Sequence, residues 1–448
     1  MTTQNNLSEK DAQYIWHPMR HYSPEKTMIF TDGTGSWVTD EHGDTYLDAM
    51  AGLWCVNVGY GREELAKAAY DQMTALSYTP MTNSHIPAIR LGEKLNEWLG
   101  DDYVFYFSNS GSEANETAFK IARQYHEANN EGSRYKFISR YRAYHGNSMG
   151  SLAATGQAKR KFNYEPLAPG FLHVTPPDSY RTPYQGTEEE QALACADEID
   201  RVIGWEINET IAAVIMEPII TGGGVLMPHE SYLKRVEEIC DKHGVLLIID
   251  EVICGFGRTG EKFGFQNYGV KPDIVTMAKG LTSAYLPLSV TAVKREIYEK
   301  FQGQEQFENF RHVNTFGGNP AACALALKNV EVLEKENLVE QANIQGDKLR
   351  AGLNELLEHP LVGDVRGKGL LVGIELVENK ATKEPASSDY AKQIIALMKQ
   401  EGIIMGSNSE TVAGYDNILQ LSPPLSITND EVEKIVEALK KAFATLTK

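Results

Sequence analysis

The sequence has few cysteines, and none of them falls in a pairing motif. They are odd in number, widely spaced and free of any Cys-x-x-Cys pair: Cys55, Cys195, Cys240, Cys254 and Cys323. Such a set indicates neither a disulfide framework nor a zinc ribbon. We therefore expect a reducing compartment, no metal site, and a packing role for Cys55, although a reactive thiol is the alternative there.

Long apolar runs and an excess of positive charge are also missing. No stretch approaches ~18 uninterrupted apolar residues, the length that crosses a membrane. The N-terminus is polar and lacks the basic and apolar regions of a signal peptide. With 61 acidic and 43 basic side chains, the net charge of -18 repels a phosphate backbone. We expect a soluble cytoplasmic protein that binds neither membranes nor nucleic acid.

The chain is long enough for a large domain and a smaller one. Its 448 residues exceed one ordinary hydrophobic core. From about residue 100, short apolar runs alternate with amphipathic helical stretches, which is typical of a parallel sheet covered by helices. We predict a doubly wound α/β core with five strands: Tyr103 to Phe107, Tyr135 to Ser139, Ile211 to Met216, Val245 to Ile249 and Asp273 to Met277.

Helical patterns accompany these strands. The first strand leads into a helix, Ser112 to Tyr125, whose start is marked by Ser110 and Glu113 at capping-box spacing. A later helical stripe ends at Gly244, a residue type common just past a helix C-terminus. One β-like run, Leu370 to Leu376, and four helical patterns predict a C-terminal α+β lobe: Ala321 to Glu334, Ala342 to Leu357, Ser388 to Glu401 and Asp430 to Leu446.

Ligands of open α/β sheets bind at the carboxyl ends of the strands, so the residues that follow each strand carry the chemistry. The first strand leads to Ser108-Asn109-Ser110-Gly111-Ser112 at a helix N-terminus, which suits a phosphate, although plain helix capping is the alternative. The second leads to Tyr144-His145-Gly146, where Tyr144 stacks on a planar ring or packs in a loop. The third ends in Glu217 before the loop Thr221-Gly222-Gly223-Gly224.

The fourth and fifth strands add a carboxylate and an amine. Asp250 follows a wholly apolar strand, so we expect it to be buried and to need a partner. Lys279 follows the fifth strand, and confinement there would lower the pKa of its amine enough for it to act as a nucleophile. Phosphate cup, stacking ring, buried acid and lysine together match the needs of pyridoxal phosphate, with Lys279 as its Schiff-base partner.

These motifs resemble the class III pyridoxal-phosphate aminotransferases, which have fold type I. The similarity spans nearly the whole chain and lies in Asn109 to Glu116, Tyr144 to Gly146, Asp250 to Val252, Gly255 to Gly260 and Ala278 to Gly280. A further stretch, Met50 to Gly61, is similar to the branch of ω-amino acid:pyruvate and amine transaminases. That branch implies amino transfer to pyruvate by a ping-pong mechanism.

The resemblance also implies roles for individual residues. Asp250 would pair with the ring nitrogen of the cofactor, and Lys279 would form the internal aldimine and move the proton. Leu53 and Trp54 would line the substrate pocket with Tyr144. Tyr144 would stack on one face of the cofactor ring, Val252 would cover the other face, and Glu217 would lie near the ring oxygen. Phosphate contacts would come from Ser110, Gly111, Ser112 and a neighbouring subunit's Thr315.

Contact from a neighbouring subunit implies a homodimer with shared active sites, and leaves open whether dimers pair into tetramers. The resemblance divides the chain into a discontinuous small domain (1–60 and 326–448) and a large cofactor-binding domain (61–325). One departure stands out. Many relatives place a mobile arginine, which binds the acceptor carboxylate, where this chain has Ala413-Gly414. Either another cation such as Arg160 replaces it, or the donor lacks an α-carboxylate, as taurine, β-alanine and primary amines do.

Other functions fit parts of the same pattern. Ile15-Trp16-His17-Pro18 resembles the N-terminal motif of the diaminopelargonate aminotransferase of biotin synthesis. Aminomutases and decarboxylases use the same scaffold with an equivalent of Lys279 and Asp250. A regulator that binds the cofactor without turnover is disfavoured by the acidic charge and the lysine. Alanine formation from pyruvate distinguishes a transferase from an aminomutase, a decarboxylase or a regulator.

Overall fold

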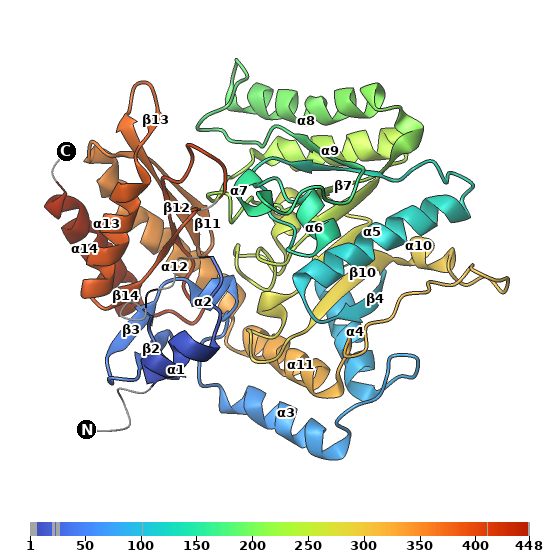
Figure 1. Ribbon diagram of the computed structural model, residues 1–448, viewed down its shortest axis with the longest axis horizontal. Helices are drawn as coiled ribbons and strands as arrows, with labels where there is room; N and C mark the ends of the chain where they lie inside the picture. Colours follow the sequence, from blue (N-terminus) through green and yellow to red (C-terminus); the bar gives the residue numbers. More distant parts are fainter. Residues whose placement is uncertain (1–6, 20–22, 24–26, 101, 410, 447–448) are drawn as a thin grey trace.

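The computed structural model describes residues 7–19, 23, 27–100, 102–409 and 411–446. Part of the N-terminal segment predicted at 1–60 therefore lies outside the described residues. Figure 1 shows a large sheet with helices around it and, beside it, a smaller lobe built from the C-terminal third of the chain and the N-terminal strands.

The central sheet has seven strands in the order β4-β10-β9-β8-β7-β5-β6. All five predicted strands are present within one residue of their expected bounds. Neighbours from β9 to β6 are parallel, whereas β10 is antiparallel to both of its neighbours. The strands are β4 (Tyr103–Ser108), β5 (Lys136–Arg140), β6 (Phe171–Val174), β7 (Ile211–Met216), β8 (Leu246–Asp250), β9 (Ile274–Met277) and β10 (Ser289–Lys294).

Strands β6 and β10 were not predicted from the sequence. β10 is buried but contains Ser289 and Thr291, which interrupt its apolar pattern. The Thr291 hydroxyl donates to the Ala114 carbonyl at 2.9 Å, so a polar residue is accommodated inside the core. β6 is a short edge strand with a histidine in it. Both strands therefore lack the continuous apolar run that revealed the other five.

The helices cover this sheet and build the smaller lobe. In α9, the predicted stripe of Leu233, Val236, Ile239 and Cys240 is buried, and the helix ends at Gly244 in the left-handed conformation. Among the described residues, no helix is both long and apolar enough to span a bilayer. The helices are α1 (Leu7–Tyr14), α2 (Ala51–Trp54), α3 (Glu63–Ala75), α4 (Ile86–Leu99), α5 (Gly111–Ala128), α6 (Met149–Ala154), α7 (Ala158–Lys161), α8 (Glu188–Trp205), α9 (Glu230–His243), α10 (Arg295–Glu299), α11 (Pro320–Lys335), α12 (Leu338–Leu353), α13 (Ser388–Gln400) and α14 (Asn429–Thr445).

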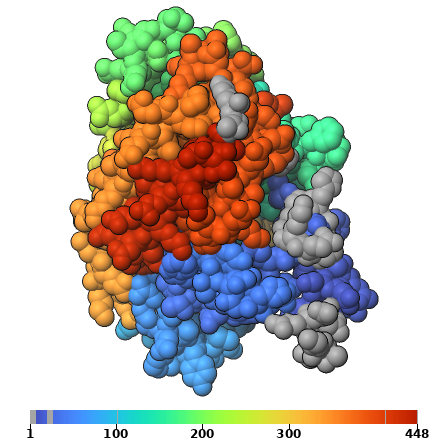
Figure 2. Space-filling view, turned by 90° about the vertical axis from the view of Figure 1, so that its left-hand side faces the viewer, coloured from blue at the N-terminus to red at the C-terminus, as the bar shows by residue number. Residues whose placement is uncertain are grey.

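The smaller lobe joins segments from both ends of the chain. β14 pairs in parallel with β3, so a C-terminal segment completes the N-terminal sheet. Figure 2 shows the N-terminal strands directly beneath the C-terminal helices on this face. The two sheets are β1 (Phe30–Thr34), β2 (Trp37–Asp40), β3 (Thr45–Asp48) and β14 (Ile403–Ile404), and β11 (Val362–Lys368), β12 (Leu371–Asn379), β13 (Glu384–Pro385), β15 (Gly406–Ser407) and β16 (Ile418–Leu421).

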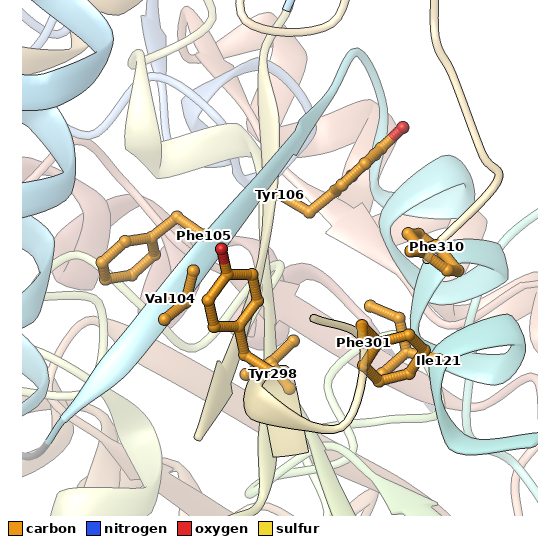
Figure 3. Close-up of a pocket in the computed structure, with 8 residues that line it drawn as sticks. Val104, Phe105, Tyr106, Ile121, Tyr298, Phe301 and Phe310 are labelled. Carbon is orange, nitrogen blue, oxygen red and sulfur yellow. The ribbon is translucent and has the colours of Figure 1, made fainter. Parts of the chain in front are cut away.

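An apolar cavity of about 250 Å³ lies beside the edge strand β4. Figure 3 shows aromatic rings from β4, from α10 and from the loop after α10 around it. The cavity is lined along the middle of the strand, away from the carboxyl ends of the parallel strands. The lining residues are Val104, Phe105, Tyr106, Ile121, Val293, Tyr298, Phe301 and Phe310.

A buried carboxyl holds the loop that follows β8. The side chain of Glu251 is fully buried and accepts the backbone N–H groups of Gly264 at 2.8 Å and Phe265 at 2.7 Å. Burial raises the pKa of Glu251 to about 8, more than these two hydrogen bonds lower it. The folded protein therefore binds this proton more tightly than the unfolded chain, in which a glutamate has a pKa of about 4.3.

This carboxyl should make stability depend on pH in a predictable direction. Its contribution to the free energy of unfolding is complete below about pH 4 and is lost as the pH rises through about 8. We expect Glu251→Gln, which is neutral at every pH, to lack this loss. Thermal unfolding of both proteins at about pH 5 and about pH 8 should show a smaller fall in Tm for the variant. An equal fall in both would contradict the assignment.

Candidate active site

Asp250 is the last residue of β8, and its side chain is buried at the carboxyl edge of the central sheet. One carboxylate oxygen, Oδ2, lies 2.8 Å from Nδ1 of His145 and accepts the side-chain amide of Asn115 at 2.8 Å. The other, Oδ1, accepts the Val252 backbone N–H at 3.1 Å. The carboxylate therefore has the partners that burial requires and is held in one orientation.

His145, Asn115 and Thr276 form a polar chain around this carboxylate. Asn115 donates to the His145 carbonyl at 2.6 Å, and the Thr276 hydroxyl donates to Asn115 Oδ1 at 2.8 Å, which fixes which end of the amide faces Asp250. The Nε2 atom of His145 is buried without a partner among the described residues. No local sequence pattern predicts a role for these three residues. Thr276, a lone polar residue in a buried strand, was the available signal.

Lys279 begins a short 3-10 helix, η5 (Lys279–Leu281), directly after β9. Its φ of 43° lies in the left-handed region, a strained conformation that is frequent at functional sites. Burial lowers the pKa of Lys279, and the nearby Cys55, Asp250 and Glu217 partly offset that effect. Its ammonium lies 5.2 Å from the centre of the Trp54 ring. The structure thus brings the predicted lysine and acid into one site.

The predicted phosphate cup lies at the N-terminus of α5. Ser110 caps this helix, and the reciprocal capping box with Glu113 is present as predicted. The first-turn N–H groups at Gly111 and Ser112 have no acceptor within the helix, and this end of α5 is partly open to solvent. A Cβ added to Gly111 would lie 3.0 Å from the Val252 side chain, so only glycine lets Val252 approach the cup this closely.

Tyr144 and Glu217 meet at the same edge. The Tyr144 backbone N–H donates to Glu217 Oε1 at 3.1 Å, and the Thr221 hydroxyl donates to Oε2 at 2.8 Å. Burial raises the pKa of Glu217. The glycine loop after Thr221 is tightly held, because the Arg142 guanidinium donates to the Gly223 carbonyl at 2.7 Å.

Arg160 lies over the exposed side of Tyr144. Its guanidinium carbon is 5.4 Å from the centre of the Tyr144 ring, and its Nε donates to Gln157 Oε1 at 3.3 Å. No carboxylate pairs with it among the described residues. The segment 411–416 packs beside Arg160, because Lys159 pairs with Asp416 and its N–H donates to the Thr411 carbonyl at 3.1 Å.

Two predicted site residues do not join this cluster within one chain. The Leu53 side chain is 62% exposed. Thr315 is exposed, and its carbonyl accepts a hydrogen bond from the Tyr78 hydroxyl at 2.9 Å. The described residues hold no group of three or more His, Cys, Asp or Glu side chains that could bind a metal ion.

The residues that do meet fit pyridoxal phosphate. A helix N-terminus suits its phosphate, a buried and oriented carboxylate suits its ring nitrogen, and a partly buried lysine of lowered pKa suits its aldehyde. The orphaned Nε2 of His145 and the unpaired Arg160 leave polar groups for further contacts. No described residue obstructs this assignment through a competing salt bridge to Lys279.

Comparison with known proteins points to the same family. The model of the class III aminotransferases matches residues 19–443. An uncharacterised aminotransferase, YhxA, of Bacillus subtilis is 62% identical, over 98% of this chain and 97% of its own. The taurine–pyruvate aminotransferase of Bilophila wadsworthia is 42% identical, over 97% and 96%.

A solved structure agrees in fold as well as in sequence. The crystal structure of a Bacillus anthracis aminotransferase superposes with a TM-score of 0.97 at 61% identity and covers 99% of this chain and 98% of its own. Fold type I, pyridoxal phosphate as cofactor and amino transfer as the reaction are thereby confirmed. The chain belongs to the class III aminotransferases, enzymes that depend on pyridoxal phosphate.

Proposed function

We propose that this enzyme transfers the amino group of an ω-amino acid, a taurine-like donor or a primary amine to pyruvate, giving alanine. The observation that carries the proposal is the guanidinium of Arg160, which lies over Tyr144 and has no carboxylate partner among the described residues. The 42% identity to a taurine–pyruvate aminotransferase over nearly the full chain supports it. The reaction would follow a ping-pong course, with the donor leaving before pyruvate binds.

Arg160 would take the place of the mobile arginine that is absent at Ala413. A guanidinium binds a carboxylate or sulfonate through two parallel hydrogen bonds, and few other side chains do so. Its stack on Tyr144 would place it beside the ring that the cofactor covers. Pyruvate and an acidic donor such as taurine would then bind through the same cation in successive half-reactions.

The cofactor would supply the electron sink, and the residues of this chain would hold it and move the proton. Asp250 would keep the ring nitrogen protonated. Lys279 would bind the cofactor covalently through Nζ and, once displaced by the donor amine, carry a proton from the donor carbon to the cofactor. Ring contacts would come from Tyr144, Val252 and Glu217, and phosphate contacts from Ser110, Gly111, Ser112 and Thr315 of the partner subunit.

Thr315 requires a homodimer, and its exposure in a single chain supports that arrangement. Phe316 and Val313 beside it are 65% and 69% exposed, which leaves apolar surface for a second copy to cover. Leu53 and Trp54 would line the substrate pocket at the same entrance. We retain the division into a large domain at 61–325 and a small domain at 1–60 and 326–448, and a location in the cytoplasm, as parts of this proposal.

The diaminopelargonate aminotransferase reaction is the second candidate. It is favoured by Ile15-Trp16-His17-Pro18, in which Trp16 is 97% exposed and thus free to contact a substrate or a second subunit. Aminomutase and decarboxylase reactions use the same acid and lysine and rank behind both. The product formed decides among them.

The decisive measurement is alanine formation from pyruvate by the cofactor-loaded enzyme. We expect turnover with at least one of taurine, β-alanine and 1-phenylethylamine. A parallel assay with S-adenosylmethionine and 8-amino-7-oxononanoate should give no diaminopelargonate. Turnover only in the parallel assay would favour the diaminopelargonate aminotransferase reaction. Absence of product in all assays would favour a mutase or decarboxylase.

Lys279→Ala should abolish both turnover and the visible absorption band of the lysine-bound cofactor. The reason is that Lys279, directly after β9, supplies the amine of lowered pKa that would bind the cofactor aldehyde. Lys271→Ala, which removes an exposed lysine nearby in sequence, is the matched control and should behave as wild type. Full activity of the Lys279 variant would disprove the assignment.

Arg160→Ala should raise the KM for pyruvate roughly 10- to 100-fold, the loss expected for charge-assisted hydrogen bonds, with a small change in kcat. The KM for taurine or β-alanine should rise as well, whereas that for 1-phenylethylamine, which has no acidic group, should not. Arg160→Lys should recover part of the loss. Lys161→Ala, the neighbouring cation, is the control. Equal effects on acidic and neutral donors would argue for a merely structural role.

A further inference from the structure

The segment 310–318 runs beside β4 of its own chain. The Tyr106 hydroxyl donates to the His312 carbonyl at 2.7 Å, and the rings of Tyr106 and His312 stack at 5.5 Å. Figure 3 shows Tyr106 on β4 with Phe310 close by, and their ring centres are 5.5 Å apart. The segment therefore follows the strand toward its carboxyl end, where the phosphate cup begins.

The end of this segment is tightly docked. A Cβ added to Gly317 would lie 2.4 Å from the Phe107 carbonyl, so the turn approaches β4 as closely as glycine allows. His85, which is buried, donates from Nε2 to the Gly318 carbonyl at 2.7 Å. The Tyr78 hydroxyl donates to the Thr315 carbonyl at 2.9 Å. The backbone around Thr315 is thus fixed while its side chain faces outward.

A single hydrogen bond joins this turn to the start of the phosphate cup. The Asn314 side-chain amide donates to the Ser108 hydroxyl at 2.7 Å, and Ser108 is fully buried. Ser108 is two residues before the helix cap Ser110, and Asn314 directly precedes Thr315. Adjacent residues are ~3.8 Å apart along the backbone, so the bond restricts the distance between Thr315 and the cup.

We propose that Asn314, through its bond to Ser108, is a positioning residue that holds Thr315 in place for the cofactor phosphate of the partner subunit. The inference rests on the proposed function, in which Thr315 of each subunit contacts the cofactor phosphate of its partner. Each chain then contributes a cup to one site and Thr315 to the other. Asn314 ties the turn to the cup of its own chain, so the Thr315 side chain is already in place for the second site.

Such a role predicts that loss of the bond weakens cofactor binding at the site that receives Thr315. Titration of the cofactor-free dimer with pyridoxal phosphate, followed by absorbance of the lysine-bound form, measures that affinity.

Asn314→Ala should weaken cofactor binding about fivefold, the effect of one hydrogen bond. Ser108→Ala should do the same from the other side. An unchanged affinity would overturn the proposal. The double variant should bind no more weakly than either single variant, because both remove the same bond. Asn309→Ala, which removes an exposed amide in the same loop, is the matched control and should titrate as wild type. Circular dichroism and size-exclusion chromatography should show all variants folded and dimeric.

Mixed dimers separate this proposal from the one on which it rests. One subunit carries Lys279→Ala and gives no absorption band, so the band reports only the intact site. Thr315→Ala or Asn314→Ala placed in the Lys279→Ala subunit should weaken binding at that intact site. If neither does, the contact of Thr315 with the partner's cofactor is wrong. If Thr315→Ala does and Asn314→Ala does not, the contact stands and the positioning role of Asn314 is wrong.

Discussion

Burying the carboxylate of Asp250 at the end of β8 costs free energy that only hydrogen-bond donors can offset, and this requirement organises the whole carboxyl edge of the sheet. The donors come from three places: Asn115 on α5, His145 after β5 and the backbone at Val252. Each of these elements also carries a cofactor contact in the proposed site. The contacts that orient Asp250 therefore also position the phosphate cup, Tyr144 and Val252.

The sequence could predict this acid because a continuous apolar strand leads to it. The same signal located β5, β7, β8 and β9, which pair in parallel and are largely buried. It also located the edge strand β4, which is apolar although half of its residues are only partly buried. β10 was not predicted because it includes Ser289 and Thr291, and the buried Thr291 hydroxyl donates its hydrogen bond to the Ala114 carbonyl of a helix distant in sequence. The role of His145 was not predicted for a related reason. Its contact with Asp250 joins two residues that lie 105 positions apart, and no local sequence pattern records such a contact.

The segment around Ala413, where the expected mobile arginine is missing, is held in place by neighbouring residues. From the sequence, Ala413 shows only that a cation is absent. In the fold, the Lys159–Asp416 pair holds the segment around it against α7, and the Tyr415 ring lies 5.1 Å from the Arg142 guanidinium and 5.8 Å from that of Arg181. A segment held at both ends is suited to be a wall of the pocket. A substitute cation must then come from elsewhere, and α7 is the element that packs against this wall.

Charge gives the same element a second role. The chain carries a net charge of -18, which at long range repels the pyruvate anion. On α7 three consecutive side chains are basic, Lys159, Arg160 and Lys161, and within the part of the chain that the structure describes only Lys159 forms a salt bridge. Charges within a Debye length of ~8 Å at physiological ionic strength act on a ligand more strongly than distant ones. In the proposed function, Arg160, whose guanidinium lies over the Tyr144 ring, would therefore be the cation that draws the acidic group of a substrate toward the site.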